Sequence, residues 1–343
     1  MEYVKREFRL KNFGFCDTSP EEFYRFQFYW PSQPTSYVVY RVIIAFYQTL
    51  WNSLVIIYWD DTRFYRPIDN KAKWPIYLSN WSFFFLTLYF VIAAASAVTY
   101  HFNKNKAKVS STSPESVRMG SIKTTSPILP STEDPAEPDS SLTSRPLPWY
   151  FKVTWCLQTI ASSAVLFVAM GYWFFEYDPA LEKLHVFTLH VHAVGTVLAI
   201  IDFTVSAHPF RILHFVYPML YFTVYVIFTV IYYYAGGLNP YGGKEMYEGL
   251  IDWEDGVKPS VFMALMFTLV VGPVLHAMYF GLYLLRRFVA GEISVSCQRC
   301  RRDKGSDRDD RMGWTGDVEK DEDRKRLDND IENGIAECVD MHN

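Results

Sequence analysis

Residues 189–202 read LHVHAVGTVLAIID, an apolar run that opens with His190 and His192 and closes with Asp202. With its apolar flanks, the run reaches the ~20 residues that a transmembrane helix needs. An ionisable side chain inside a bilayer is costly, so these three residues mark a candidate functional site. The interpretation depends on whether the rest of the chain also belongs to a membrane.

Apolar stretches of similar length recur along the 343-residue chain, which is 50% hydrophobic and 18% aromatic. We expect six membrane spans, at 37–58, 79–101, 149–173, 184–206, 212–235 and 260–285. Tryptophans lie near the ends of these stretches, as interfacial aromatic belts require: they are Trp51, Trp59, Trp81, Trp149 and Trp173. The sequence therefore predicts an all-α fold, a six-helix transmembrane bundle.

The distribution of lysine and arginine predicts the orientation of this bundle. The arm before the first span, the 102–148 connection, the turn at Arg211 and the tail from Arg286 together carry 24 of these residues. The three connections on the other side carry seven. Because positive loops stay in the cytosol, we expect both termini there.

The segments outside the bundle differ in composition. Residues 1–36 form a cytosolic aromatic and basic arm, which we expect to lie against the membrane surface. The six-span membrane domain covers 37–290, and its 103–148 connection is rich in Ser, Thr and Pro, a composition that predicts disorder. Residues 291–343 form a charged tail, which we also expect to be disordered.

The ionisable residues of the fourth span fall into two groups at different depths. His190 and His192 are roughly 9–12 Å from the outer end of the span, and Asp202 is about 15 Å further along the axis from His192. Asp202 therefore cannot act directly with that histidine. We expect it to pair with Arg211 or His214 near the inner end.

Two hydroxyl groups are candidates to meet the outer histidines. Ser79 lies where the second span begins on the outer side, and Thr87 lies two turns deeper, at the depth of His190 and His192. A hydroxyl next to a neutral imidazole is the minimum for nucleophilic acyl transfer. Ser79, Thr87, His190 and His192 are thus the candidate catalytic residues.

Roles other than acyl transfer remain open for these side chains. Ser, Thr and His often join membrane helices by hydrogen bonds without any catalytic role. Haem could be held if His276 of the sixth span faced His190 or His192, and the same three histidines could ligate zinc. We expect neither a cofactor nor a metal, because neither set has the further ligands that it needs.

Four segments resemble the rolling stone family of membrane proteins. They are YRVIIAFYQTLW at 40–51, WPIYLSNWSFFF at 74–85, HVHAVGTVLAIIDFTVSAHPFRILHFVYP at 190–218 and YEGLIDW at 247–253. The resemblance covers about 37–290. It implies a plasma-membrane protein linked to myoblast fusion during muscle development, and it implies no molecular mechanism.

A more distant likeness concerns the androgen-induced gene family of intramembrane threonine hydrolases, which cleave fatty-acid esters of hydroxy fatty acids. In WPIYLS, Ser79 stands where that family has its threonine, and His192 stands ten residues before Asp202. Thr87 in FLTL matches the family's letters but lies further along the helix. The likeness implies that Ser79 or Thr87 attacks an acyl carbon while His192 takes the proton.

We therefore expect a rolling-stone-like protein of the plasma membrane, rather than the endoplasmic reticulum, that acts in developmental cell fusion. The alternatives are an intramembrane hydrolase of lipid esters and a structural or adaptor protein without catalysis. The expected partners are the lipid bilayer, a lipid-ester substrate in the hydrolase case, and proteins bound through the linker and tail. No nucleic-acid partner is expected.

Overall fold

The computed structural model describes residues 7–15, 18–28, 33–59, 71–111, 146–179, 184–247 and 250–309. Most of the 103–148 connection and the end of the 291–343 tail lie outside these ranges, so their predicted disorder stays a prediction. The chain divides into two compact units, Met1–Tyr283 and Leu284–Asn343. The first unit holds the candidate site.

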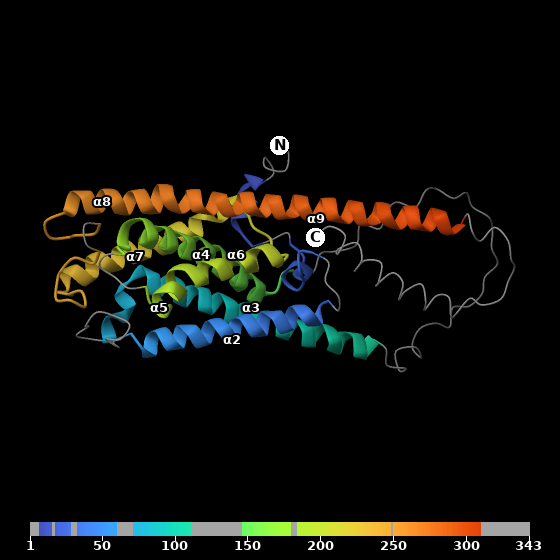
Figure 1. The fold of residues 1–343 in the computed structure, drawn as a ribbon, viewed down its shortest axis with the longest axis horizontal. Helices are drawn as coiled ribbons and strands as arrows, with labels where there is room; N and C mark the ends of the chain where they lie inside the picture. Colours follow the sequence, from blue (N-terminus) through green and yellow to red (C-terminus); the bar gives the residue numbers. More distant parts are fainter. Residues whose placement is uncertain are drawn as a thin grey trace, which may run out of the picture. The chain divides into compact units, whose positions relative to one another are not determined.

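The described part of the chain is helical, with two isolated β-bridges and no strand. Figure 1 shows the longer helices of the first unit running alongside one another. Six helical segments within the described residues are long and apolar enough to cross a membrane. They are Thr35–Ile57, Leu78–Ala107, Trp149–Glu176, Val186–Val205, Ile212–Tyr234 and Val257–Gly291. The predicted all-α, six-span fold is confirmed.

Several of the spans consist of more than one helical element. The first three are α2 (Thr35–Ile57), α3 (Leu78–Ser111) and α4 (Trp149–Gly171), and α4 continues into a π-helical turn, η5 (Tyr172–Glu176). The fourth joins α5 (Val186–Leu189), the π-helical η6 (His190–Val194) and α6 (Gly195–Val205). The fifth joins the 3₁₀ turn η7 (Ile212–Phe215) to α7 (Val216–Tyr234). The sixth joins α8 (Val257–Met266), the π-helical η8 (Phe267–Val271) and α9 (Gly272–Asp309).

The sequence explains where two of these spans end. α6 ends at Val205, and Ser206 is already extended. His208 precedes Pro209, and a residue before proline is pushed out of the helical region.

α7 ends at Tyr234. Beyond it, Gly236 takes φ +80, and the amides of Gly236 and Gly237 donate to the carbonyls of Tyr233 and Tyr232. Glycine adopts this left-handed conformation without a steric penalty.

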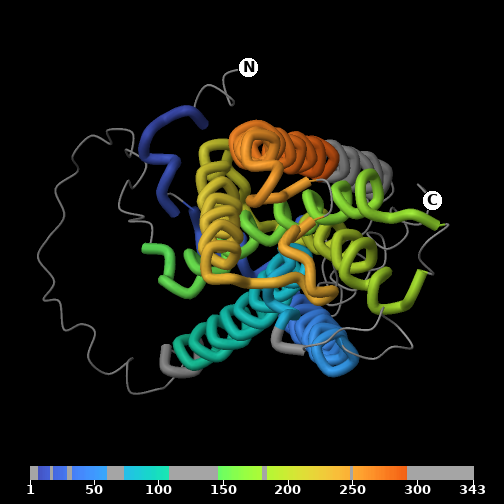
Figure 2. The backbone as a smooth tube through the Cα atoms, turned by 90° about the vertical axis from the view of Figure 1, so that its left-hand side faces the viewer, coloured from blue at the N-terminus to red at the C-terminus, as the bar shows by residue number. Residues whose placement is uncertain are grey.

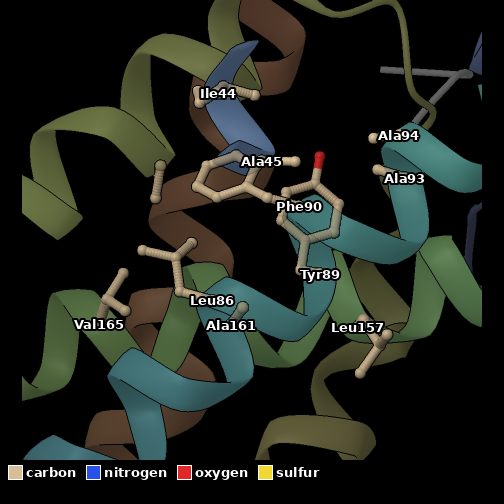
Figure 3. Packing of buried hydrophobic residues seen from close by; sticks show 11 residues of the cluster. Ile44, Ala45, Leu86, Tyr89, Phe90, Ala93, Ala94, Leu157, Ala161 and Val165 are labelled. Carbon is tan, nitrogen blue, oxygen red and sulfur yellow. The ribbon is translucent and has the colours of Figure 1, made fainter. Parts of the chain in front are cut away.

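α3 and α4 form the centre of the bundle. In the apolar 18-residue stretch of each of these two spans, 56% and 61% is buried, against 28% for the fifth and sixth. Figure 2 shows α2 (blue) and α3 (cyan) side by side, and α3 also contacts α4. Figure 3 shows Leu86 and Phe90 of α3 packed near Ala45 of α2 and Ala161 and Val165 of α4. Small residues such as these alanines let membrane helices approach closely.

Two short 3₁₀ turns lie before the first span: η1 (Leu10–Phe13) and η2 (Pro20–Phe23). A third, η3 (Lys71–Ile76), leads into α3. The arm that carries η1 and η2 was expected to lie on the membrane surface. Within the arm, Phe23 and Tyr24 are 1% and 2% exposed because their rings pack between the helix ends. The position of the arm relative to a membrane stays a prediction.

Candidate functional site

An ion pair is buried where α2 begins and α6 ends. The Arg41 guanidinium donates to the Asp202 carboxylate with an Nη1–Oδ1 distance of 2.8 Å, and the two side chains are 0% and 1% exposed. Arg41 lies about 9 Å along the helix axis from Thr35, where the first span begins. A charged side chain at this depth is tolerated when it is paired with an opposite charge and each of its hydrogen-bond donors has an acceptor.

Five tyrosine, serine and histidine residues complete the hydrogen bonding of the pair. Tyr40 donates to Asp202 Oδ1 at 2.8 Å, and Tyr89 donates to Oδ2 at 2.6 Å. The Nε–H of Arg41 donates to the Tyr37 hydroxyl at 2.7 Å, and its Nη2 donates to Ser206 Oγ and His208 Nε2 at 2.9 and 3.0 Å. With Nη1 bonded to Asp202 and Tyr89, partners exist for all five N–H groups of a guanidinium.

His208 extends this network toward α4. Arg41 can only donate, so His208 Nε2 is an acceptor, and the ring proton must be on Nδ1. Nδ1 lies 3.2 Å from Gln158 Oε1 and donates to it. The hydrogen bonds therefore connect α2, α3, α4 and the chain just after α6 into one buried polar network.

The N-terminal arm covers this network. The Gln27 amide donates to the Val205 carbonyl at 2.7 Å, and the Ala207 amide donates to the Arg25 carbonyl at 3.2 Å. The bonds form a bridge between Phe26 and Ser206. Phe23 packs against the His208 ring with centroids 5.0 Å apart. The arm thus closes the end of the bundle where the ion pair lies.

The expected pairing of Asp202 with Arg211 or His214 is wrong. The bend at His208-Pro209 turns the chain away from α6 before Arg211, so neither residue can follow Asp202 along one helix face. Instead, His214 Nε2 lies 3.3 Å from the Gly14 carbonyl of the arm. The Arg211 guanidinium lies 5.6 Å from the Trp155 ring and 3.9 Å from Glu7.

His190 has partners on both ring nitrogens. Nδ1 lies 2.9 Å from the Val186 carbonyl and donates to it, so Nε2 accepts from the Tyr47 hydroxyl at 3.0 Å. The ring also stacks on Trp51 of α2, with centroids 3.4 Å apart and 16° between the planes. These contacts hold His190 against α2.

His192 faces a different neighbour. Its ring stacks on Tyr172 of η5 with centroids 3.8 Å apart, and its carbonyl accepts from Trp173 Nε1 at 3.0 Å. Residues two apart in a helical turn lie on nearly opposite sides of its axis, which explains why the two imidazoles separate. The Nδ1 atom of His192 is buried and makes no hydrogen bond to the described residues.

The two candidate nucleophiles occupy different environments on α3. Thr87 is 7% exposed, donates to the Phe83 carbonyl at 2.9 Å and accepts from Gln48 Nε2 at 3.4 Å. Ser79 is half-buried on the first turn of α3. In the described ranges, no hydrogen bond joins either hydroxyl to His190 or His192. Their catalytic roles stay predictions.

His276, the third histidine of the haem and zinc alternatives, lies at the other end of the bundle. Its Nε2 donates to the Arg211 carbonyl at 3.0 Å, and its ring stacks on Phe210 with centroids 4.6 Å apart. Among the residues that the structure describes, no three His, Cys, Asp or Glu side chains gather as a metal-ligand set.

Sequence reasoning missed Arg41, although a signal for it was present. Of the 33 Lys and Arg residues, 31 fall outside the expected spans, and the two that remain are Arg41 and Lys152. A lone arginine six residues into an apolar helix needs a buried acid. Asp202 was the only acid inside an expected span, so the two could have been matched.

Comparison with known proteins agrees with the resemblance of the four segments. The family described as protein rolling stone matches residues 2–123 and 138–300. Protein rolling stone of Drosophila melanogaster is 28% identical over 293 residues, which are 84% of this chain and 92% of that protein. No solved structure matches. With six apolar helices and a family match over most of its length, the chain is a multi-pass membrane protein that belongs to the rolling stone family.

Proposed function

We propose that this protein acts at the plasma membrane in the fusion of cells during development, with myoblast fusion as the first case to test. The observation that carries the proposal is the family match, which includes all six spans and 92% of the Drosophila relative. Because the match extends over the whole bundle, it favours a shared role of the bundle and not a role of a single segment.

The geometry favours a scaffold without catalysis. The buried charges at the arm end are bonded to one another, and His190 has both nitrogens occupied. Polar groups that are fully satisfied within a protein rigidify it. A rigid bundle of this kind suits a protein that presents its loops to another membrane.

The proposed outward surface is the 236–259 connection. Its turn is held by the Asn239 carboxamide, whose oxygen accepts from the amides of Tyr241 and Gly243 at 2.9 and 2.8 Å. Tyr241 is 56% exposed, and Lys244 pairs with Glu254. The excess of lysine and arginine on the other side supports this orientation.

The test is rescue of fusion in myoblasts that lack their own relative of this protein. Cells expressing the wild-type chain should regain mixing of cytoplasmic contents, scored with two halves of a split fluorescent protein. Tyr241→Ala should reduce fusion without lowering surface biotinylation, and Val197→Ala, on an exposed face of α6, is the matched control. A chain that reaches the surface and restores no fusion would contradict the proposal.

Hydrolysis of lipid esters is the second candidate, favoured by one observation. The Nδ1 atom of His192 is buried without a partner among the described residues. A buried nitrogen of this kind calls for an explanation, and a general base for Ser79 or Thr87 is one.

A lipid-like fluorophosphonate tests this second candidate on the purified full-length chain. If the protein is a hydrolase, labelling is lost in His192→Ala and in either Ser79→Ala or Thr87→Ala. A folded wild-type chain that takes no label would exclude this serine–threonine chemistry and leave the scaffold role.

A further inference from the structure

Polar side chains from three helical elements gather beneath the arm, beside the ion-pair network. The Trp155 ring of α4 lies 5.0 Å from the His214 ring of η7. The Arg211 guanidinium lies 5.6 Å from the same indole, and the Arg211 carbonyl accepts from His276 of α9. Phe15 of the arm covers both rings: its ring centroid lies 5.3 Å from that of Trp155 and 4.7 Å from that of His214.

Several buried polar atoms in this cluster have no partner within the described ranges. The atoms are Trp155 Nε1, Gln158 Nε2, His214 Nδ1, His276 Nδ1 and the Tyr279 hydroxyl. Their side chains belong to residues that are at most 2% exposed. Tyr279 lies one turn after His276 on α9, and both rings pack against Phe210. Buried polar groups normally have a partner, in the protein or in ordered water.

The kinds of atom in the cluster decide what could bind them. The Trp155 indole and the Gln158 amide can only donate at the unpartnered nitrogen. His214 and His276 direct Nε2 toward the Gly14 and Arg211 carbonyls, so their protons are on Nε2 and each Nδ1 presents a lone pair. The set therefore mixes donors and acceptors.

This mixture excludes most classes of ligand. An anion would meet the two imidazole lone pairs, and a cation would be repelled by the Arg211 guanidinium. An apolar ligand would leave every one of these atoms unsatisfied. Water donates two hydrogen bonds and accepts two, and buried waters typically make about three bonds to such groups.

We infer that a cluster of ordered waters occupies this place, bound by Trp155, Gln158, His214, His276 and Tyr279 and closed by Phe15 of the arm. Gln158 joins the waters to the ion-pair network, because its Oε1 already accepts from His208. A continuous polar path then runs from Asp202 through Arg41, His208 and Gln158 to His276. The inference is independent of the proposed role in fusion.

The first test is a structure of the full-length chain in lipid nanodiscs, at a resolution that shows water. Density peaks within hydrogen-bond distance of Trp155 Nε1, Gln158 Nε2 and His276 Nδ1 are expected. Side chains that bond directly to one another, or a dry interior, would overturn the inference.

A pair of Tyr→Phe variants provides a second test through the sign of the change in Tm. Tyr279→Phe removes a hydroxyl that has no protein partner within the described ranges, and Tyr225→Phe removes one that donates to the Ile76 carbonyl at 2.8 Å. If waters bind Tyr279, both variants melt below the wild type. If the place is dry, Tyr279→Phe removes an unsatisfied group and melts above the wild type, which would contradict the inference.

Discussion

Arg41 and Asp202 are 161 positions apart in the sequence, yet their side chains meet at 2.8 Å in the interior of the bundle. Removing two charges from water costs several kcal/mol for each ion, and the cost is recovered only with good geometry and further hydrogen bonds. Tyr40, Tyr89, Ser206 and His208 supply those bonds. The pair therefore fixes how the first span meets the fourth.

Gly195, at the start of α6, lets this helix pack against α3. A Cβ atom at Gly195 would lie 3.1 Å from the Phe83 ring, which is 1% exposed and packed among Val55, Phe187 and Val191. Because Phe83 has little room to move, Gly195→Ala should destabilise the protein by about 1–3 kcal/mol. Thermal unfolding in detergent measures the change.

Gly281→Ala on α9 is the matched control, because nothing lies within 4 Å of its added Cβ. Alanine has the higher helix propensity, so this variant should gain about 0.5–1 kcal/mol. Equal effects of the two substitutions would contradict the packing role of Gly195.

The arm is attached to α3 through Glu21, whose carboxylate accepts from Lys104 Nζ at 2.9 and 3.0 Å and from Tyr100 at 2.9 Å. Partial burial alone would raise the pKa of Glu21, but these hydrogen bonds outweigh it and lower the pKa below its ordinary value of 4.5. Folding thus favours the ionised carboxylate. The stabilisation is complete above the ordinary pKa and is lost as pH falls through the lowered value.

Glu21→Gln should therefore lower stability at neutral pH and have no effect in acid below the lowered pKa. Both partners are more than a third exposed, so the loss at neutral pH should be at most about 1 kcal/mol. Tm measured across the acid range checks the prediction, and Lys104→Met should reproduce it. A difference between wild type and Glu21→Gln that grows in acid would have the wrong sign.

The proposed orientation predicts which exposed positions are accessible from outside the cell. Tyr241 is 56% exposed in the 236–259 connection, and Phe102 is 68% exposed on the last turns of α3 beyond Tyr100. In intact cells, a membrane-impermeant maleimide should label Tyr241→Cys above the wild-type background. Phe102→Cys should be labelled only after permeabilisation, and the reverse pattern would invert the orientation.

The six spans could be predicted from the sequence because the signal for each one is local. About 20 apolar residues in a row must cross a bilayer as a helix, whatever their neighbours. The first and fifth predicted spans, 37–58 and 212–235, lie within two residues of the structural ones at each end. The fourth span was also found, but its π-helical turn at His190–Val194 was not, since no local residue pattern marks it.

The contacts between spans could not be predicted because they depend on which helices are neighbours. His190 and His192 were grouped by depth, which the sequence gives, but their partners depend on direction around the helix. α2 meets one ring and η5 meets the other. The ring packing of the arm could not be predicted for a similar reason, since an aromatic segment can bury its rings in lipid or between helix ends with the same composition.

The most direct test of the central claim is a double-mutant cycle on the ion pair, by thermal unfolding of Arg41→Leu, Asp202→Leu and the double variant in detergent. Each single variant leaves one buried charge without its partner and should lose about 3–5 kcal/mol. The double variant should recover much of that loss, so the coupling between the two sites should be large. Two small losses that simply add would show that Arg41 and Asp202 do not hold the bundle together.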